Sequence, residues 1–237
     1  MNKSLVVSQL NVYYSHKKIL DNINFKVSSG RIVGIVGPNG AGKSTLIKSI
    51  LGLVPKTCNK IEYINQNIQL QKDKVAYIPQ RSQIDWDYPI TVQDVVLMGQ
   101  TLNSHWGLNY SKRSYELAED ALQKLGLYDL RHNRIGELSG GQQQKVFLAR
   151  SLAQEADILF LDEPLLGVDY KTQGVIFNFL QELAGNNKLI IVIHHDLGDV
   201  LTYFDELILL NRIIVAQGDC ATVLDSKMLT LAYREES

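Results

Sequence analysis

A glycine-rich stretch, GPNGAGKST at 37–45, has the residue types and spacing of a loop that binds phosphate. It satisfies the pattern G-x-x-x-x-G-K-[ST], follows an apolar run and opens a segment of helical periodicity. Glycines let backbone N–H groups approach phosphate oxygens, and the helix dipole assists. We expect Lys43 to reach the outer phosphates and Ser44 to offer its hydroxyl to Mg²⁺. The stretch predicts a nucleotide site built from Gly37, Pro38, Asn39, Gly40, Ala41, Gly42, Lys43, Ser44 and Thr45.

Two carboxylates end another apolar stretch, ILFLD at 158–162. A buried strand does not tolerate unpaired charge, so Asp162 and Glu163 indicate a cation or a water molecule at its end. Asp162 fits a carboxylate beside Mg²⁺, and Glu163 fits the base that orients and polarises an attacking water. The alternative is a simple acidic turn before Pro164, which the phosphate loop disfavours.

Three more candidate side chains stand at the ends of predicted strands. Gln80 ends YIPQ, and its neutral amide can touch Mg²⁺ or the water. His195 follows the apolar run 189–193 and can bond the γ-phosphate; strand capping or a metal site are alternatives, although adjacent histidines in a strand chelate one metal poorly. Tyr14 can stack on adenine, with Tyr13 as a rival and a plain strand aromatic as the alternative.

A second glycine-rich loop, LSGGQQQKV at 138–146, opens another helical segment. Ser139 is a plausible N-cap, so this loop also offers a hydroxyl, free N–H groups and a positive helix end to an anion. Because the first loop already holds one nucleotide, the second is expected to complete the site of another copy. Two copies arranged head to tail would enclose two ATP molecules, each approached by Ser139, Gly140, Gly141 and Gln142 of the neighbour.

Composition excludes several classes. The chain has 237 residues and a net charge of −1, so it has no basic field that would attract nucleic acid. Cys58 and Cys220 form no C-x-x-C pattern and indicate neither a disulfide scaffold nor a zinc site. The longest apolar runs fall far below the roughly 20 residues of a membrane span, and the N-terminus lacks a signal-peptide h-region, so we expect a soluble protein.

The hydrophobic periodicity predicts one α/β domain over 1–237, with a core at 1–80 and 151–237 and a mainly helical lobe at 81–150. Strands are expected at 4–14, 20–27, 31–37, 74–80, 158–162 and 189–194, with a short strand pair within 56–74 and a hairpin over 206–218. Helices are expected at 43–52 and 171–185, and a helix bracketed by Ser111 and Gly126 lies in the lobe. A short tail ends the chain.

In the order and spacing of these motifs, the chain resembles an ATP-binding subunit of an ABC transporter. The resemblance implies a P-loop NTPase core with a parallel sheet, an N-terminal antiparallel β subdomain and an inserted helical subdomain. It also implies that Gln80 couples the lobes, that Asp162 and Glu163 are the Walker B acid and the catalytic base, and that His195 is the switch histidine. Residues 139–142 match the signature motif. The dimer-contact loop, which ends at Asp169, reads LLGVD where many relatives have Ser-Ala-Leu-Asp.

A narrower resemblance in 79–99 is to the subgroup that serves importers of manganese, zinc or chelated iron. Trp86, Tyr88 and Ile90 lie in the segment where a cytoplasmic helix of the permease would bind in a groove. The alternative is that these side chains pack under their own lobe. The implied cofactors are ATP and Mg²⁺. The implied partners are a second ATPase copy, an integral membrane permease and, indirectly, a substrate-binding protein.

The expected location is the cytoplasmic face of a membrane or, for an organelle-encoded protein, the stromal side of a plastid membrane. Two alternatives stay open. One is an ABC subunit for another small solute, and the other is a soluble ABC ATPase acting in cofactor assembly or translation.

Overall fold

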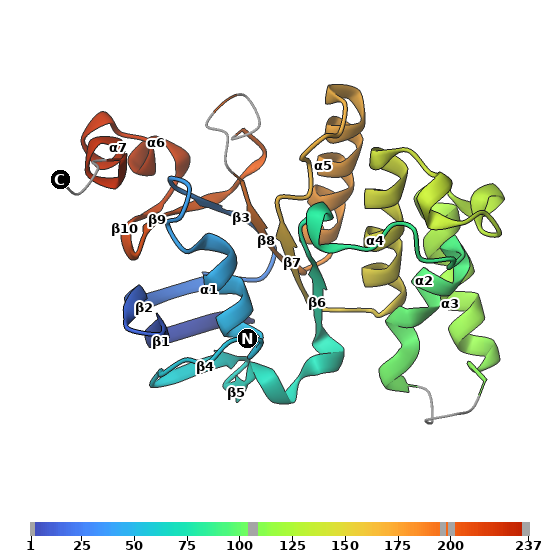
Figure 1. Cartoon of the computed structure of the whole chain (residues 1–237), viewed down its shortest axis with the longest axis horizontal. Helices are drawn as coiled ribbons and strands as arrows, with labels where there is room; N and C mark the ends of the chain where they lie inside the picture. Colours follow the sequence, from blue (N-terminus) through green and yellow to red (C-terminus); the bar gives the residue numbers. More distant parts are fainter. Residues whose placement is uncertain (1–2, 104–108, 195–197, 199–201, 234–237) are drawn as a thin grey trace.

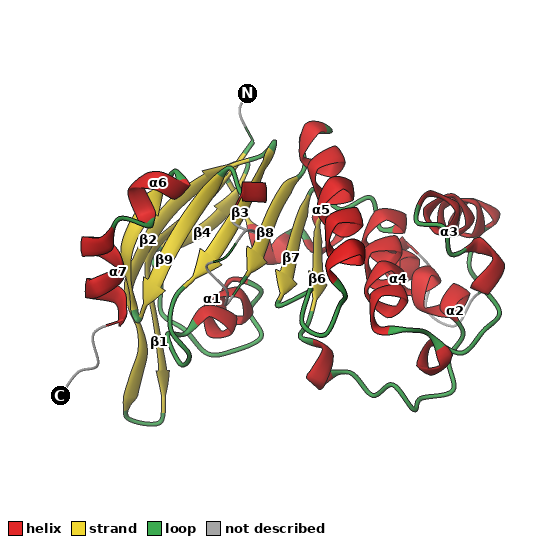
Figure 2. Cartoon of the chain, turned by 90° about the horizontal axis from the view of Figure 1, so that it is seen from above, coloured by secondary structure: helices red, strands yellow, loops and turns green. Residues whose placement is uncertain are grey.

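The computed structural model describes residues 3–103, 109–194, 198 and 202–233, and its central layer is a six-stranded sheet. The strand order is β10-β9-β3-β8-β7-β6, with β10 antiparallel at one edge and the others parallel (Figure 2). The strands are β3 Arg31–Val36, β6 Val75–Ile78, β7 Ile158–Asp162, β8 Leu189–Ile193, β9 Glu206–Asn211 and β10 Ile213–Gly218. Every residue of β7 and β8 is buried, as expected for parallel strands covered on both faces.

A second, antiparallel sheet lies against this core. Its order is β2-β1-β4-β5, formed by β1 Ser4–Tyr14, β2 Lys17–Ser28, β4 Lys60–Tyr63 and β5 Gln66–Asn67. Helix α1 (Lys43–Ile50) lies between the two sheets, and its buried residues join those of both sheets in one hydrophobic cluster (Figure 1). Packing on both sides therefore fixes the start of α1, where the phosphate loop ends.

Four further helices lie on the opposite face of the six-stranded sheet and beyond its β6 edge (Figures 1 and 2). They are α2 Val92–Leu97, α3 Lys112–Lys124, α4 Gly140–Ala153 and α5 Tyr170–Gly185. Short 3₁₀ turns connect the elements: η1 Ile68–Leu70, η2 Lys72–Lys74, η3 Arg81–Gln83, η4 Met98–Asn103, η5 Tyr128–Leu130 and η6 Ile135–Glu137. Ser111 caps α3 by accepting a hydrogen bond from Ser114 N, so the predicted start of that helix is confirmed.

The two-sheet α/β architecture with a helical insertion confirms the predicted fold class. The C-terminal segment differs from the expected short tail, because it forms α6 (Cys220–Val223) and α7 (Ser226–Tyr233). Asp219 caps α6 by accepting a hydrogen bond from Thr222 N, and Asn211 of β9 donates to Ala232 O of α7. Helix α4 also crosses residue 150, where the sequence placed the end of the lobe.

Within the described residues, no helix is both long enough and apolar enough to cross a bilayer.

Candidate functional site

The phosphate loop connects the end of β3 to the start of α1. Gly37 has φ 148°, and a Cβ atom there would collide with the carbonyl oxygen of Leu210 in β9, so only glycine lets the loop pass so close to the sheet. Gly42 is the N-cap of α1 and has no side chain to bond the first turn. The first N–H groups of a helix lack partners within the helix, so those of Lys43 and Ser44 are available to an anion.

A hollow of about 340 Å³ lies over this loop. It is lined by Tyr14, Ile19, Asn39, Gly40, Ala41, Gly42, Lys43, Ser44, Thr45 and Glu163. The volume suits a small ligand, and the lining combines backbone donors and a lysine with one aromatic ring. The structure therefore brings Tyr14 to the phosphate loop, whereas Tyr13 lies beside Lys18, with Nζ 5.7 Å from the ring centre.

Lys43 is held inside the loop that it follows. Its ammonium group donates to the carbonyl oxygens of Gly37 at 2.8 Å and Pro38 at 3.0 Å. Burial lowers the pKa of Lys43, while the negative charges of Glu163 and Asp162 act in the opposite direction. The buried ammonium and the free N–H groups at the start of α1 together make an anion-binding arrangement. A phosphate would supply the counter-charge that the carbonyl dipoles only partly provide.

Asp162 joins the phosphate loop to the end of β7. Its side chain is fully buried, and Oδ1 accepts a hydrogen bond of 2.9 Å from the Ser44 hydroxyl. The phenol oxygen of Tyr77 lies 3.5 Å from Oδ2. Burial raises the pKa of Asp162, opposed by the Ser44 hydrogen bond. The carboxylate therefore lacks a full counter-charge, and a divalent cation beside Ser44 would provide one.

Glu163 follows immediately and faces the hollow. Its carboxylate oxygen Oε2 accepts a hydrogen bond of 2.7 Å from the Gln80 amide, which comes from the loop after the neighbouring strand β6. Glu163 has φ 48°, a left-handed conformation that costs a non-glycine residue free energy and is concentrated at functional sites. The turn directs this carboxylate out of the sheet toward the hollow.

These side chains fit Mg²⁺ in their chemistry. The hydroxyl of Ser44, the carboxylate of Asp162 and the amide oxygen of Gln80 are hard oxygen donors, which this ion prefers. Mg²⁺ commonly takes only one or two protein ligands and completes its octahedron with phosphate and water oxygens. A site with few protein ligands beside a phosphate loop meets that requirement.

The second glycine-rich loop forms an N-terminal helix turn of its own. The Ser139 hydroxyl accepts from Gln142 N at 3.4 Å, and the Gln142 side chain accepts from Ser139 N at 2.9 Å, a capping box. A methyl group on Gly141 would lie 2.6 Å from Thr172 Cγ2, so α4 and α5 begin in close contact there. In the part of the chain that the structure describes, no residue of 139–142 lines the hollow.

The aromatic segment after Gln80 divides into two kinds of side chain. Trp86 packs edge-on against Phe147 of α4 at 5.9 Å between ring centres, and its N–H donates to Arg81 O at 3.0 Å. Ile90 packs against the same core. Tyr88, in contrast, is 60% exposed. Packing under the lobe thus describes Trp86 and Ile90, and only Tyr88 offers its ring to a partner.

Two candidates remain. Asp169 caps α5 by accepting from Thr172 N at 3.0 Å. His195 lies outside the described residues. The sequence patterns did not identify Tyr77. Tyr77 pairs in register with Phe160, which lies two residues before Asp162 on β7, so the side chains of Tyr77 and Asp162 lie on the same face of the sheet.

Comparisons with known proteins agree with this geometry. A family model for the ABC transporter matches residues 20–166. The chain is 48% identical to an ABC transporter ATP-binding protein from the ycf23–apcF intergenic region of Cyanophora paradoxa, over 98% of this chain and 96% of that one. It is 43% identical to a manganese transport system ATP-binding protein of Halalkalibacterium halodurans, over 99% and 93% of the two chains.

Among solved structures, the chain is similar to a metal-chelate type ABC transporter in an inward-facing conformation, with a TM-score of 0.86 and 30% identity over 98% of this chain and 89% of that one. The family match spans more than half of the chain and includes the phosphate loop, Gln80, the second glycine-rich loop and both carboxylates. The chain therefore belongs to the ABC transporter family, as a component that binds ATP and couples its hydrolysis to transport.

Proposed function

We propose that this chain energises the import of a transition metal ion (manganese, zinc or chelated iron) through a separate membrane permease. The observation that carries the proposal is the convergence of Lys43, the Ser44–Asp162 pair and the Gln80–Glu163 pair around one hollow. The transported class rests on similarity to a manganese transport ATP-binding protein and to a metal-chelate type transporter.

The site residues divide the work of ATP hydrolysis. The backbone of residues 39–45 and Lys43 bind the phosphates, and Tyr14 stacks on the base. Mg²⁺, held beside Ser44, Asp162 and Gln80, would neutralise charge that develops on the phosphates. Glu163 accepts a hydrogen bond from the attacking water and orients it in line with the γ-phosphate. In this scheme His195 contacts the γ-phosphate.

The second glycine-rich loop completes the site of a second copy. Its capped helix turn presents N–H groups and a positive dipole end, yet the hollow of the same chain is lined by other residues. A head-to-tail dimer would place residues 139–142 of each copy against the γ-phosphate bound to the other. ATP binding would close this dimer and hydrolysis would reopen it.

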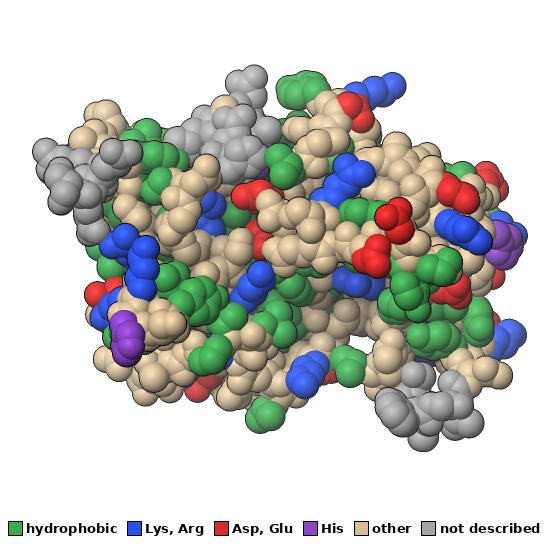
Figure 3. All heavy atoms as spheres, viewed as in Figure 1, with side chains coloured by type: hydrophobic (Ala, Val, Ile, Leu, Met, Phe, Trp, Pro, Cys, Tyr) green, Lys and Arg blue, Asp and Glu red, His purple; other side chains and the backbone are tan. Residues whose placement is uncertain are grey.

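The permease would contact the lobe and the core at exposed apolar residues. Tyr88 follows the Gln80 loop, and Met98 and Leu102 are exposed in η4, which follows α2. Figure 3 shows hydrophobic side chains gathered on the surface of the α2–α3 part of the lobe. Leu53 after α1 is 60% exposed on the core side. We propose that 81–150 moves as a helical subdomain against the core at 1–80 and 151–237, on the cytoplasmic face of the membrane.

The proposal is tested by isolating the native complex and identifying its membrane subunit. The complex is then reconstituted in liposomes with its substrate-binding protein, and ATP hydrolysis and uptake of Mn²⁺, Zn²⁺ and an iron chelate are measured. ATP-dependent uptake of one of these metals supports the proposal. Uptake of an unrelated solute, or co-purification with ribosomes or cofactor-assembly proteins instead of a permease, contradicts it.

A further inference from the structure

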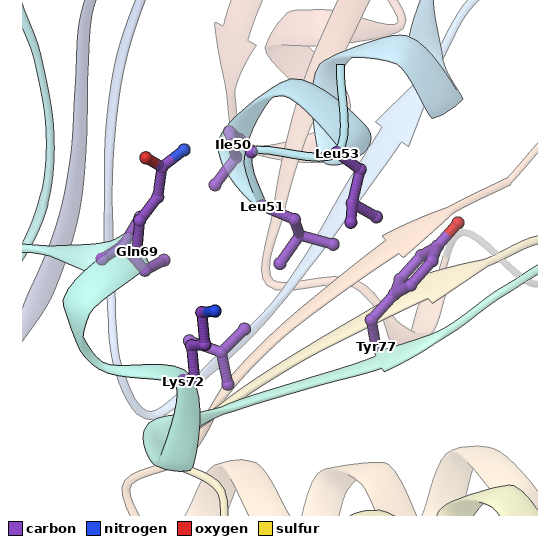
Figure 4. A pocket seen from close by; sticks show the side chains of 9 residues that line it. Ile50, Leu51, Leu53, Gln69, Lys72 and Tyr77 are labelled. Carbon is purple, nitrogen blue, oxygen red and sulfur yellow. The ribbon is translucent and has the colours of Figure 1, made fainter. Parts of the chain in front are cut away.

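A groove on the core side of the molecule is lined by Tyr77, whose hydroxyl also approaches Asp162. It has a volume of about 580 Å³ and lies between the end of α1, the η1–η2 segment and β6. Figure 4 shows Leu51, Leu53 and Tyr77 around it, with the Tyr77 ring rising from β6 toward the α1 side. Tyr77 is therefore a wall of this groove.

The same side chain reaches Asp162. The Tyr77 ring lines the groove, while its hydroxyl oxygen lies 3.5 Å from Asp162 Oδ2, at the outer limit of a hydrogen bond. The backbone of β6, an edge strand, is held by α4 and its C-cap: Arg150 donates to Tyr77 O at 2.7 Å and Gln154 donates to Val75 O at 2.9 Å. With its backbone held, Tyr77 presents its hydroxyl at a defined position.

The direction of this contact follows from the chemistry of the two groups. An ionised carboxylate only accepts hydrogen bonds, so the phenol must be the donor. The phenol of tyrosine is a hydrogen-bond donor at neutral pH, so Tyr77 supplies the proton that this contact needs. Each oxygen of the buried Asp162 carboxylate therefore faces one hydroxyl, Ser44 at Oδ1 and Tyr77 at Oδ2.

We propose that Tyr77 is a positioning residue for the magnesium site: it holds Oδ2 of Asp162 and thereby keeps Oδ1 turned toward Ser44. Ser44 and Asp162 are among the residues that would hold Mg²⁺. The inference rests on the proposed function for the presence of Mg²⁺ and ATP. Hydrogen bonds to a ligating or neighbouring carboxylate commonly affect metal affinity by tenfold or more.

Tyr77→Phe removes the hydroxyl and keeps the ring. Tyr63→Phe is the matched control, because the Tyr63 hydroxyl also lies near one side-chain oxygen, Ser29 Oγ at 3.2 Å, and Tyr63 does not line the hollow. Mn²⁺, used as a paramagnetic substitute, is titrated into the full chain with a non-hydrolysable ATP analogue, and bound metal is read by electron paramagnetic resonance. Affinity for a fluorescent ATP analogue is measured separately in the absence of divalent metal.

The expected result is about tenfold weaker Mn²⁺ binding by Tyr77→Phe, with unchanged metal-free nucleotide affinity and an unchanged thermal midpoint. Tyr63→Phe is expected to bind Mn²⁺ like the wild type. Equal Mn²⁺ affinity in Tyr77→Phe and the wild type would overturn the inference. An equal loss of Mn²⁺ affinity in Tyr77→Phe and Tyr63→Phe would also overturn it, and either result leaves the proposed function standing. A wild-type chain without nucleotide-dependent Mn²⁺ binding argues against the proposed function itself.

Discussion

The Gln80 amide donates a hydrogen bond of 2.7 Å to Oε2 of Glu163, which links the loop after β6 to the residue that follows β7. Gln80 begins the segment that continues through Trp86 and Tyr88 into the helical lobe, whereas Glu163 directly follows β7 of the central sheet. A movement of that segment therefore changes the position of the carboxylate that is proposed to orient water. The contact gives a physical route between the exposed lobe surface and the catalytic step.

Replacing Glu163 with glutamine separates ATP binding from hydrolysis. Glu163→Gln keeps the size of the side chain and an oxygen that accepts from Gln80, but loses the basicity that polarises water. We expect nucleotide affinity near that of the wild type, loss of steady-state ATP hydrolysis, and an ATP-dependent dimer seen by light scattering. Glu119→Gln, on the lobe helix α3, is the control. Normal turnover in Glu163→Gln would remove Glu163 from the proposed role.

Changing Ser139 in the Glu163→Gln background tests whether the second loop serves a neighbour. Ser139→Arg places a bulky cation at the start of α4 and removes its cap, at a cost in stability of about 1 kcal/mol. The expected product is a monomer that still binds a fluorescent ATP analogue. If nucleotide binding by the monomer disappears as well, the loop belongs to the site of its own chain, and the shared-site proposal fails.

Lys43→Ala is expected to weaken nucleotide binding itself. The variant loses a charged donor to phosphate, which corresponds to at least about tenfold in affinity. It also loses the two hydrogen bonds that hold the loop carbonyls of Gly37 and Pro38. Equilibrium binding of a fluorescent ATP analogue measures the effect, and Lys124→Ala at the far end of α3 controls for loss of one positive charge. Unchanged affinity would contradict the placement of phosphate at this loop.

Trp86 and Tyr88 are expected to respond differently to truncation. Trp86→Ala removes a ring packed on Phe147, so the free energy of unfolding should fall by about 2 kcal/mol. Tyr88→Ala removes an exposed ring and should leave stability and basal ATP hydrolysis unchanged while reducing transport by the reconstituted complex. Urea unfolding and uptake assays separate the two. Full transport by Tyr88→Ala would mean that this ring makes no essential permease contact.

A pH-dependent contribution to stability is expected at the opposite end of β7. Burial acts to raise the pKa of Asp157, but hydrogen bonds and charges of Lys188 and Lys3 hold it below its ordinary value. A depressed folded pKa gives stability that is present above the unfolded pKa, about 3.9, and is lost as pH falls through the folded value.

Lys188→Met should therefore be less stable than wild type by about 1 kcal/mol at pH 7, with the gap closing in acid. Urea unfolding at several pH values measures this. Lys112→Met, which removes an exposed ion pair with Glu116, should show no such gap. A Lys188→Met deficit that is constant with pH would rule out the electrostatic origin.

The sequence predicted those parts of the fold and site that depend on local pattern. The strands at β3, β7 and β8 are continuous apolar runs, and the phosphate loop is a contiguous motif whose neighbours confirm it. The capping of α3 by Ser111 is also local. The structure of each of these segments is determined by residues close to it in the sequence.

Contacts between distant segments could not be predicted in the same way. The Gln80–Glu163 hydrogen bond and the approach of Tyr77 to Asp162 depend on β6 and β7 being neighbours, and sequence alone does not give strand order. The division between half-buried Trp86 and exposed Tyr88 depends on where α4 packs. Helix α7 depends on tertiary contacts such as the Asn211–Ala232 bond, since short helices are marginal by themselves.

The separation of the second glycine-rich loop from the hollow of its own chain has a genetic consequence. If every nucleotide is enclosed by two polypeptides, a mutation at Ser139 in one subunit impairs the nucleotide site of the wild-type subunit with which it pairs, and not its own site. Cells expressing both alleles would assemble dimers of one mutant and one wild-type subunit, in which at most one of the two nucleotide sites is intact. Such a lesion would behave as dominant, and its severity would rise with the dose of the defective allele.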